Sequence, residues 1–189
     1  MFNPNNKAAS AALLLIDPFI RPSKSNFKTK KAKKQKQANM NTKDSIKTIW
    51  MSAQRFLARR EHSRKELLQK LQAKEFPNNE IETVLYELAA RGWQDDRKFC
   101  EAFIRFRVMK GQGPQKIIHE LKTKAVDAAI IAEEMQMYDA QWLQLCENVA
   151  RKKYGSEKVN SIEDRAKRYR FLSTRGFPSE IVKQVLTLF

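Results

Sequence analysis

The chain repeats itself at a spacing of about 50 residues, and this repeat limits its possible folds more than any other feature. A shift of 50 and then 51 residues superimposes apolar positions of three segments: Leu68, Ile118 and Tyr169; Leu71, Leu121 and Leu172; Phe76, Val126 and Phe177. Periods of this length are typical of arrays in which each unit is one supersecondary motif that contacts mainly its neighbours. The sequence therefore predicts three copies of one unit.

Each unit is predicted to contain three helices. From residue 44 onward apolar residues recur with a period near 3.6, and no stretch alternates as a half-buried strand would. First helices are expected at 44–60, 95–110 and 139–153, and second helices at 63–74, 114–124 and 164–175. A third apolar helix follows each second helix, and Pro77, Pro114 and Pro178 mark helix starts, where proline removes no helical hydrogen bond.

The predicted fold is all-α, with three tandem three-helix repeats stacked into an elongated, curved array around a shared core. The expected divisions of the chain are a tail at 1–43 and repeats at 44–92, 93–137 and 138–189. No apolar run reaches the roughly 18 residues that span a bilayer, so no membrane segment is expected.

Positive charge is concentrated in the first 43 residues. The whole chain has a net charge of +16, and residues 1–43 hold ten Lys or Arg and one Asp. A segment this basic and this poor in apolar residues cannot offset its ordering entropy, so we expect it to be disordered. It either adds affinity for phosphate backbones, has no role, or is an extension upstream of a start at Met40.

Signals for catalysis and metal binding are weak or absent. The sequence has no phosphate-binding loop, and His62 and His119, both expected at the surface, have no partners at metal-ligand spacing. Asp95 and Asp96 are interpreted as acids at a helix start, which stabilise exposed N–H groups. We therefore expect no enzyme activity, no cofactor and no metal, and Cys100 and Cys146 are expected to be buried thiols in a reducing compartment.

Aromatic residues in the middle repeat are expected to belong to the core. Phe99, Phe103 and Phe106 have the spacing of one buried helix face, which favours packing over a platform for stacking bases.

Basic residues of the middle and third repeats are expected to face an anionic partner. Their second helices contain one acid each, Glu120 and Asp164. A one-sided charge of this kind favours an anion-facing surface over a merely solvated one. The residues expected to face the partner are Lys98, Arg105, Lys110, Lys116, Lys122, Lys124, Arg165, Arg168 and Arg170.

The segment that joins the first two repeats carries a specific motif. It reads Arg91, Gly92, Trp93, Gln94, Asp95, Asp96, Arg97, Lys98, Phe99 and Cys100, and it is followed by Arg105, Lys110, Gly111, Gly113, Pro114, Ile117, Leu121 and Lys124. In this pattern residues 45–189 closely resemble the RecX family. The chain departs from the family at Gln94, where an aliphatic residue is common, and at Ala125 and Val126, where Gly precedes an aliphatic residue.

The resemblance implies a cytoplasmic bacterial regulator of the recombinase RecA, with roles in DNA repair, recombination and the SOS response. Such a protein is expected to act as a monomer, to bind the groove of the RecA filament on single-stranded DNA, and to suppress strand exchange and ATP hydrolysis. Binding to double-stranded DNA stays open. The motif residues Gly92, Trp93, Asp95, Asp96, Phe99, Gly111, Gly113, Pro114 and Leu121 are expected to be mainly structural.

Two other classes of function remain open on the residues alone. The chain could be a DNA-binding protein of helix-turn-helix type, which would bind duplex DNA without RecA. It could also be a helical scaffold whose basic faces are merely solvated.

Overall fold

The structure, a computed structural model, describes residues 42–189. All of the predicted basic tail except its last two residues lies outside this range. The compact unit Thr42–Phe189 contains nine α-helices and one short 3-10 helix, and no strand among the described residues. The predicted all-α fold is confirmed for this part of the chain.

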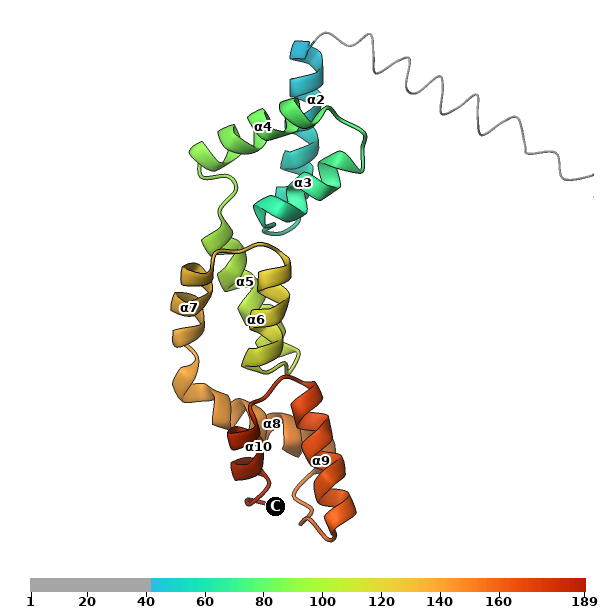
Figure 1. Cartoon of the computed structure of the whole chain (residues 1–189), viewed down its shortest axis with the longest axis vertical. Coiled ribbons are helices and arrows are strands. Elements are labelled where there is room, and N and C mark those ends of the chain that lie inside the picture. The colour runs from blue at the N-terminus through green and yellow to red at the C-terminus, as the bar shows by residue number, and fades with distance from the viewer. Residues whose placement is uncertain (1–41) are drawn as a thin grey trace, which may run out of the picture. The chain divides into compact units, whose positions relative to one another are not determined.

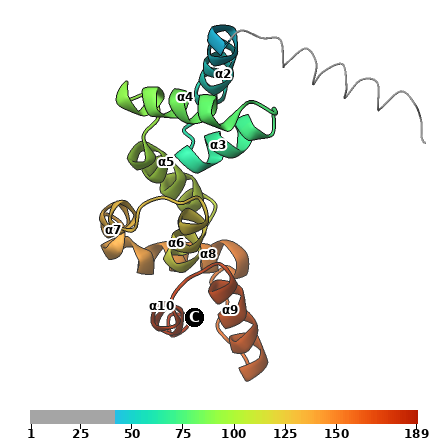
Figure 2. The same cartoon turned by 45° about the horizontal axis from the view of Figure 1, so that its top comes forward.

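The helices form three groups of three that follow one another along the unit (Figures 1 and 2). The first repeat contains α2 (Thr42–Leu57), α3 (Arg64–Gln72) and α4 (Asn78–Ala90). The second contains α5 (Asp96–Met109), α6 (Pro114–Thr123) and α7 (Ala128–Gln136). The third contains η1 (Asp139–Gln141), α8 (Trp142–Tyr154), α9 (Ile162–Thr174) and α10 (Ser179–Val185).

Short polar side chains fix where several helices begin. Ser63 Oγ accepts a hydrogen bond from the backbone N–H of Glu66 (3.2 Å), and Asp95 accepts one from that of Arg97 (2.7 Å). Ser161 caps α9 in the same way. These bonds satisfy N–H groups that have no partner within their own helix, so the sequence itself sets the helix boundaries.

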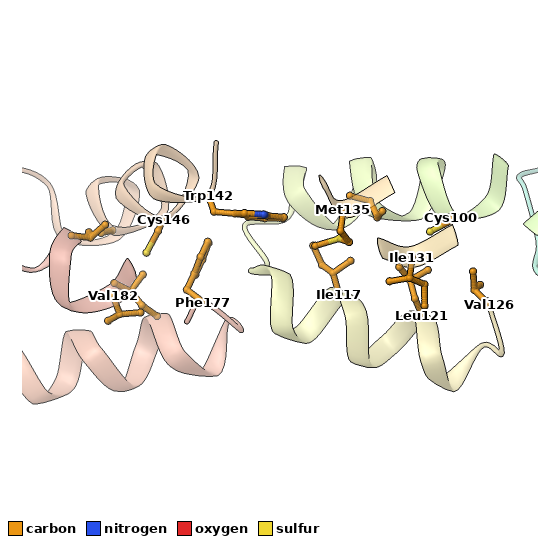
Figure 3. Packing of buried hydrophobic residues seen from close by; sticks show 14 of the residues in the cluster. Cys100, Ile117, Leu121, Val126, Ile131, Met135, Trp142, Cys146, Phe177 and Val182 are labelled. Atoms are coloured by element: carbon orange, nitrogen blue, oxygen red, sulfur yellow. The ribbon is translucent and has the colours of Figure 1, made fainter. Parts of the chain in front are cut away.

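Buried apolar side chains of the described residues form two clusters, so the expected shared core is confirmed for the second and third repeats and is wrong for the first. The first repeat has its own cluster, which includes Ile49 and Leu85. The second and third repeats share the other. Figure 3 shows Trp142 lying between residues of these two repeats, with Phe177 beside it on the side of the third.

Both cysteines belong to the larger cluster. Cys100 and Cys146 are free thiols with no exposed surface. Burial raises the pKa of each to about 12, so both remain neutral and unreactive near neutral pH. The prediction of buried thiols is confirmed.

The predicted aromatic core is only partly correct. Phe99 is buried and Phe103 packs against the cluster, but half of the Phe106 surface is exposed. Phe106 follows Phe99 by seven residues, close to two helical turns. It lies near the end of α5, where its ring stays half exposed although the later residue Val108 packs against the cluster.

The second helices of the repeats meet end to end at two junctions. At the first junction the start of α3 meets the end of α6, where Ser63 Oγ donates to the carbonyl of Lys124 (3.1 Å). At the second junction the start of α6 meets the end of α9. There the N–H of Gly113 donates to the carbonyl of Arg175 (2.8 Å), and the N–H of Gln115 donates to that of Gly176 (3.0 Å).

Direct backbone contact at the second junction requires glycine. A Cβ on Gly113 would lie 2.4 Å from the carbonyl carbon of Gly176, and a Cβ on Gly176 would lie 2.4 Å from the Cβ of Lys116. Gly176 also has a φ of +93°. The equivalent residue at the first junction, Ala125, has a φ of 56° and keeps its side chain because side chains separate the two helices there.

Substitutions at the two equivalent turns should therefore act in opposite directions. Gly176→Ala should lower the free energy of unfolding by about 2 to 4 kcal/mol, because it adds left-handed strain and a backbone clash. Ala125→Gly should raise it by up to about 1 kcal/mol, because it relieves strain and leaves the hydrogen bonds of the junction in place. Urea unfolding of the two variants measures both effects, and a neutral Gly176→Ala would contradict the described junction.

Candidate nucleic-acid interface

Six of the nine basic residues expected to face an anionic partner lie at the surface without an acidic partner among the described residues: Lys98, Lys110, Lys116, Lys122, Arg165 and Arg170. They come from the second and third repeats. Lys98 is exposed in the first turn of α5, and Lys110 directly follows the last residue of that helix. The others lie on α6 and α9, the two helices that meet at the second junction.

The other three cations are engaged within the fold. Arg105 is exposed but pairs with Glu101 on the next turn (3.0 Å). Lys124 is half-buried and pairs with Glu66 of the first repeat. A neighbouring carboxylate pairs with each of these two cations, so each should attract an external anion less strongly than an unpaired cation would.

Arg168 is buried, which corrects the prediction that it points outward. Only 3% of its surface is exposed. Its guanidinium pairs with Asp164 (2.9 Å), donates to the carbonyl of Glu157 (2.9 Å), and lies over the ring of Tyr154. Arg168 therefore anchors the loop before α9. Its spacing from Asp164, four residues along a helix, is the signal that could have predicted this role.

At the first junction, each repeat supplies charged groups to the helix end of the other. Asp96 of the second repeat accepts a hydrogen bond from the backbone N–H of Arg64 at the start of α3 (2.9 Å). Lys65 of the first repeat donates to the carbonyl of Thr123 at the end of α6 (2.9 Å). An anion at a helix start and a cation at a helix end are both favourable to the helix dipole. The motif acid Asp96 thus joins two repeats, beyond the expected role at its own helix.

Glu66 completes this junction. Burial opposes its ionisation, but hydrogen bonds from Arg60 and Lys124 outweigh that effect and hold the pKa of this carboxyl below its ordinary value. The Arg60 nitrogen lies 2.8 Å from the carboxylate. Glu66 therefore stays ionised and neutralises cations of two repeats.

His62 is buried at this junction, so its expected place at the surface is wrong. Only 3% of its surface is exposed. Its Nδ1 donates to the carbonyl of Arg60 (2.9 Å), and its own carbonyl accepts from Gln94 (3.4 Å). Burial is the largest influence on its ring and lowers its pKa below the ordinary value of 6.5. His119 is exposed, as predicted.

The motif residue Trp93 lies on the outside of the first repeat. Half of its surface is exposed, and its ring centroid lies 6.1 Å from that of Trp50. Arg91 lies over the other ring of this pair, 4.8 Å from the centroid. Of the other motif residues, Phe99, Gly113, Pro114 and Leu121 are buried, Asp95, Asp96 and Gly111 are half-buried, and Gly92 is exposed.

Two cations near the second junction, Lys152 and Lys153, were missed from the sequence, whereas Arg175 belongs to the predicted basic second helix of the third repeat. Lys152, Lys153 and Arg175 lie around one hollow between the second and third repeats. The run of basic residues at the end of α8 was a usable signal, but periodicity alone did not indicate that α8 and α9 bring these side chains together.

Within residues 42–189, no cluster of three or more His, Cys, Asp or Glu could hold a metal ion. In the same range, no helix is both long enough and apolar enough to cross a membrane.

Comparison with protein families gives three matches in chain order. Residues 50–88 match the model for the RecX first three-helix domain, residues 95–135 that for the second, and residues 139–186 that for the third. Each match lies within one of the three helix groups of the structure.

Individual relatives agree with the family matches. The regulatory protein RecX of Legionella pneumophila (strain Corby) is 37% identical over 134 residues, which cover 71% of this chain and 89% of the relative. The regulatory protein RecX of Stenotrophomonas maltophilia (strain K279a) is 34% identical over 128 residues, 68% of this chain and 78% of the relative. The crystal structure of RecX from Lactobacillus salivarius shares the fold with a TM-score of 0.65 at 21% identity, covering 77% of this chain and 99% of that one.

Protonation of His62 at acidic pH should lower the free energy of unfolding. Because the folded chain has the lower pKa, the unfolded chain binds the proton more tightly. The stability that the fold has with a neutral His62 ring is fully present above pH 6.5, and it is lost as the pH falls from 6.5 through the pKa of His62 in the folded chain. Urea unfolding between about pH 7.5 and pH 5 should therefore show falling stability, in a range above the titration of the carboxyl groups.

Two variants separate this effect from other causes. His62→Gln should remove most of the pH dependence, whereas His119→Gln should leave it intact because that ring is exposed. If the two variants give the same pH profile as the wild type, the assignment to His62 fails.

Proposed function

This chain belongs to the RecX family, and we propose that it regulates the recombinase RecA by binding, without catalysis, to the filament that RecA forms on DNA. Its relatives are named as regulatory proteins. The observation that carries the proposal is the set of exposed cations on the second and third repeats that have no acidic partner among the described residues.

The shared core of the second and third repeats supports a binding role for this surface. Because one apolar cluster joins the two repeats, α6 and α9 hold their cations on one body. A polyanion that contacts several of these cations displaces counterions at each contact. Each exposed contact contributes little alone, so binding depends on many contacts in register.

Inhibition follows if this body occupies the filament. A protein held on the filament by phosphate and carboxylate contacts blocks the positions that DNA strands and incoming subunits need. No chemical step is required for that effect. The mechanism therefore needs only affinity, a fitting shape and a positive surface, and the exposed cations of the second and third repeats support the last of these.

The described surface is tested by a set of charge reversals. Lys116→Glu, Lys122→Glu and Arg170→Glu together should weaken inhibition of the DNA-dependent ATP hydrolysis of RecA by about tenfold or more, because three attractive contacts become repulsive. The melting temperature should hardly change, since all three side chains are exposed.

A matched variant keeps this test specific. Lys47→Glu, Arg55→Glu and Arg59→Glu make the same change in charge on exposed positions of the first repeat. If both triple variants lose inhibition equally, the proposed binding surface is contradicted. If the wild-type protein has no effect on RecA at any ratio, the proposed function is contradicted. Tight, sequence-dependent binding to duplex DNA in that case would favour the helix-turn-helix alternative.

The basic tail is expected to add affinity without specificity. Deletion of residues 1–39 removes nine Lys or Arg. Inhibition of RecA should be largely kept, while binding to single-stranded DNA should weaken at low salt and depend less steeply on salt. The logarithmic slope should fall by about 0.7 for each phosphate that the tail neutralises in the full chain. Fluorescence anisotropy at several salt concentrations measures this slope, and an unchanged slope would show that the tail binds no phosphate.

A further inference from the structure

Both junctions between repeats enclose a hollow, and equivalent elements line the two. The first hollow, of about 390 Å³, lies between α5, the end of α6 and the first repeat. The second, of about 460 Å³, lies between α8, the end of α9 and the second repeat. Because the two arise at the same place in the repeat, each serves as a comparison for the other.

The first hollow neutralises its own charges. Its cations Arg60 and Lys124 both pair with Glu66, and Arg107 pairs with Glu120 on α6 (2.7 Å). Two carboxylates, Glu66 and Glu120, thus pair with all three of these basic side chains.

The second hollow has cations and no acid. It is lined by Lys110, Lys152, Lys153 and Arg175, and no Asp or Glu is among its lining residues. Repeat spacing explains the difference. The residue that corresponds to Glu66 is Lys116, 50 positions later, and the one that corresponds to Glu120 is Phe171, 51 positions later.

Aromatic contact takes over part of the role of the missing acids. The Nζ of Lys153 lies 3.7 Å from the ring centroid of Phe171, and the guanidinium carbon of Arg175 lies 5.1 Å from it. A ring face attracts a cation but does not neutralise it. The positive charges are therefore held close together without a counter-ion, which costs electrostatic energy until an anion binds.

The other residues that line the second hollow favour an organic anion as its ligand. Leu145 and Val149 supply partly exposed apolar surface, and Gln112, which also lines the hollow, has a side-chain oxygen that is buried and accepts no hydrogen bond from the described residues. A buried acceptor without a donor is costly, and an exocyclic amine of a nucleobase would satisfy it.

We propose that the hollow between the second and third repeats is a binding site for a nucleoside phosphate. Its phosphates contact Lys152 and Lys153, and its base lies on the apolar wall with an edge toward Gln112. The ligand is either a free nucleotide or one unit of a single strand. If the ligand is one unit of a single strand, this proposal rests on the proposed function; if the ligand is a free nucleotide, it does not.

Isothermal titration of the full chain tests the site without RecA, so its outcome is separate from that of the inhibition assay. The probes are ATP, inorganic phosphate and a short single-stranded oligonucleotide. Lys152→Glu should weaken ATP binding by at least about tenfold, because it removes a charged hydrogen bond and adds repulsion. Lys183→Glu, which changes the same charge in the last turn of α10 and lies outside the hollow, should change it less than about twofold.

Gln112→Leu tests the base contact. It should weaken binding of ATP and leave that of inorganic phosphate unchanged, a split that general loss of structure would not produce. Oligonucleotide binding that weakens in parallel with ATP assigns the site to a strand, and oligonucleotide binding that is unaffected assigns it to a free nucleotide. The proposal is overturned if Lys152→Glu and Lys183→Glu act alike, if wild type binds no ATP, or if inorganic phosphate binds as tightly as ATP.

Discussion

The way the three repeats join depends on which groups pair with the free N–H and carbonyl groups at the ends of the second helices. An α-helix leaves N–H groups unpaired at its start and carbonyls unpaired at its end. In this chain α3, α6 and α9 meet end to end, so the carbonyls that end α9 accept from the start of α6, and those that end α6 accept from residues at the start of α3. The positive end of one helix dipole thereby faces the negative end of the next. A single three-helix unit would leave these groups to water, so the contact between helix ends favours joining the repeats at this place.

The two junctions meet this requirement by different means. At the second junction backbone donates directly to backbone, which demands glycine at 113 and 176 and brings the repeats close enough to share one apolar cluster. At the first, the side chains of Ser63, Lys65 and Asp96 span the gap, and the first repeat keeps a cluster of its own. The link to the first repeat is therefore made largely of polar and ionisable groups, whereas the link between the other two is made of backbone and apolar surface. Stability at the first junction responds to pH and salt, and stability at the second responds mainly to packing.

Sequence periodicity predicted the secondary structure well because each helix buries its own apolar stripe. The helix starts at Pro114 and after Ser63 and Asp95 needed only local rules for capping. Errors arose where contacts between repeats decide the environment. His62 looked like a surface residue because its sequence neighbours are polar, yet the second repeat covers it through Gln94. The same limit applies to the candidate site, since a lysine on a helix can be free, as Lys122 is, or committed across a junction, as Lys124 is.

Charge is distributed among the repeats according to what each junction requires. The carboxylate of Glu66 in the first repeat pairs with a cation of its neighbour, and Glu120 in the second pairs with Arg107 of its own repeat. At the second junction the equivalent residues are Lys116 of the second repeat and Phe171 of the third, so the same fold leaves cations around that junction without carboxylates. Since the backbone arrangement is retained, the acids are not needed there for folding. Carboxylates therefore neutralise the cations at one junction and are absent from the equivalent place at the other, and this difference is the basis of the anion site that we propose there.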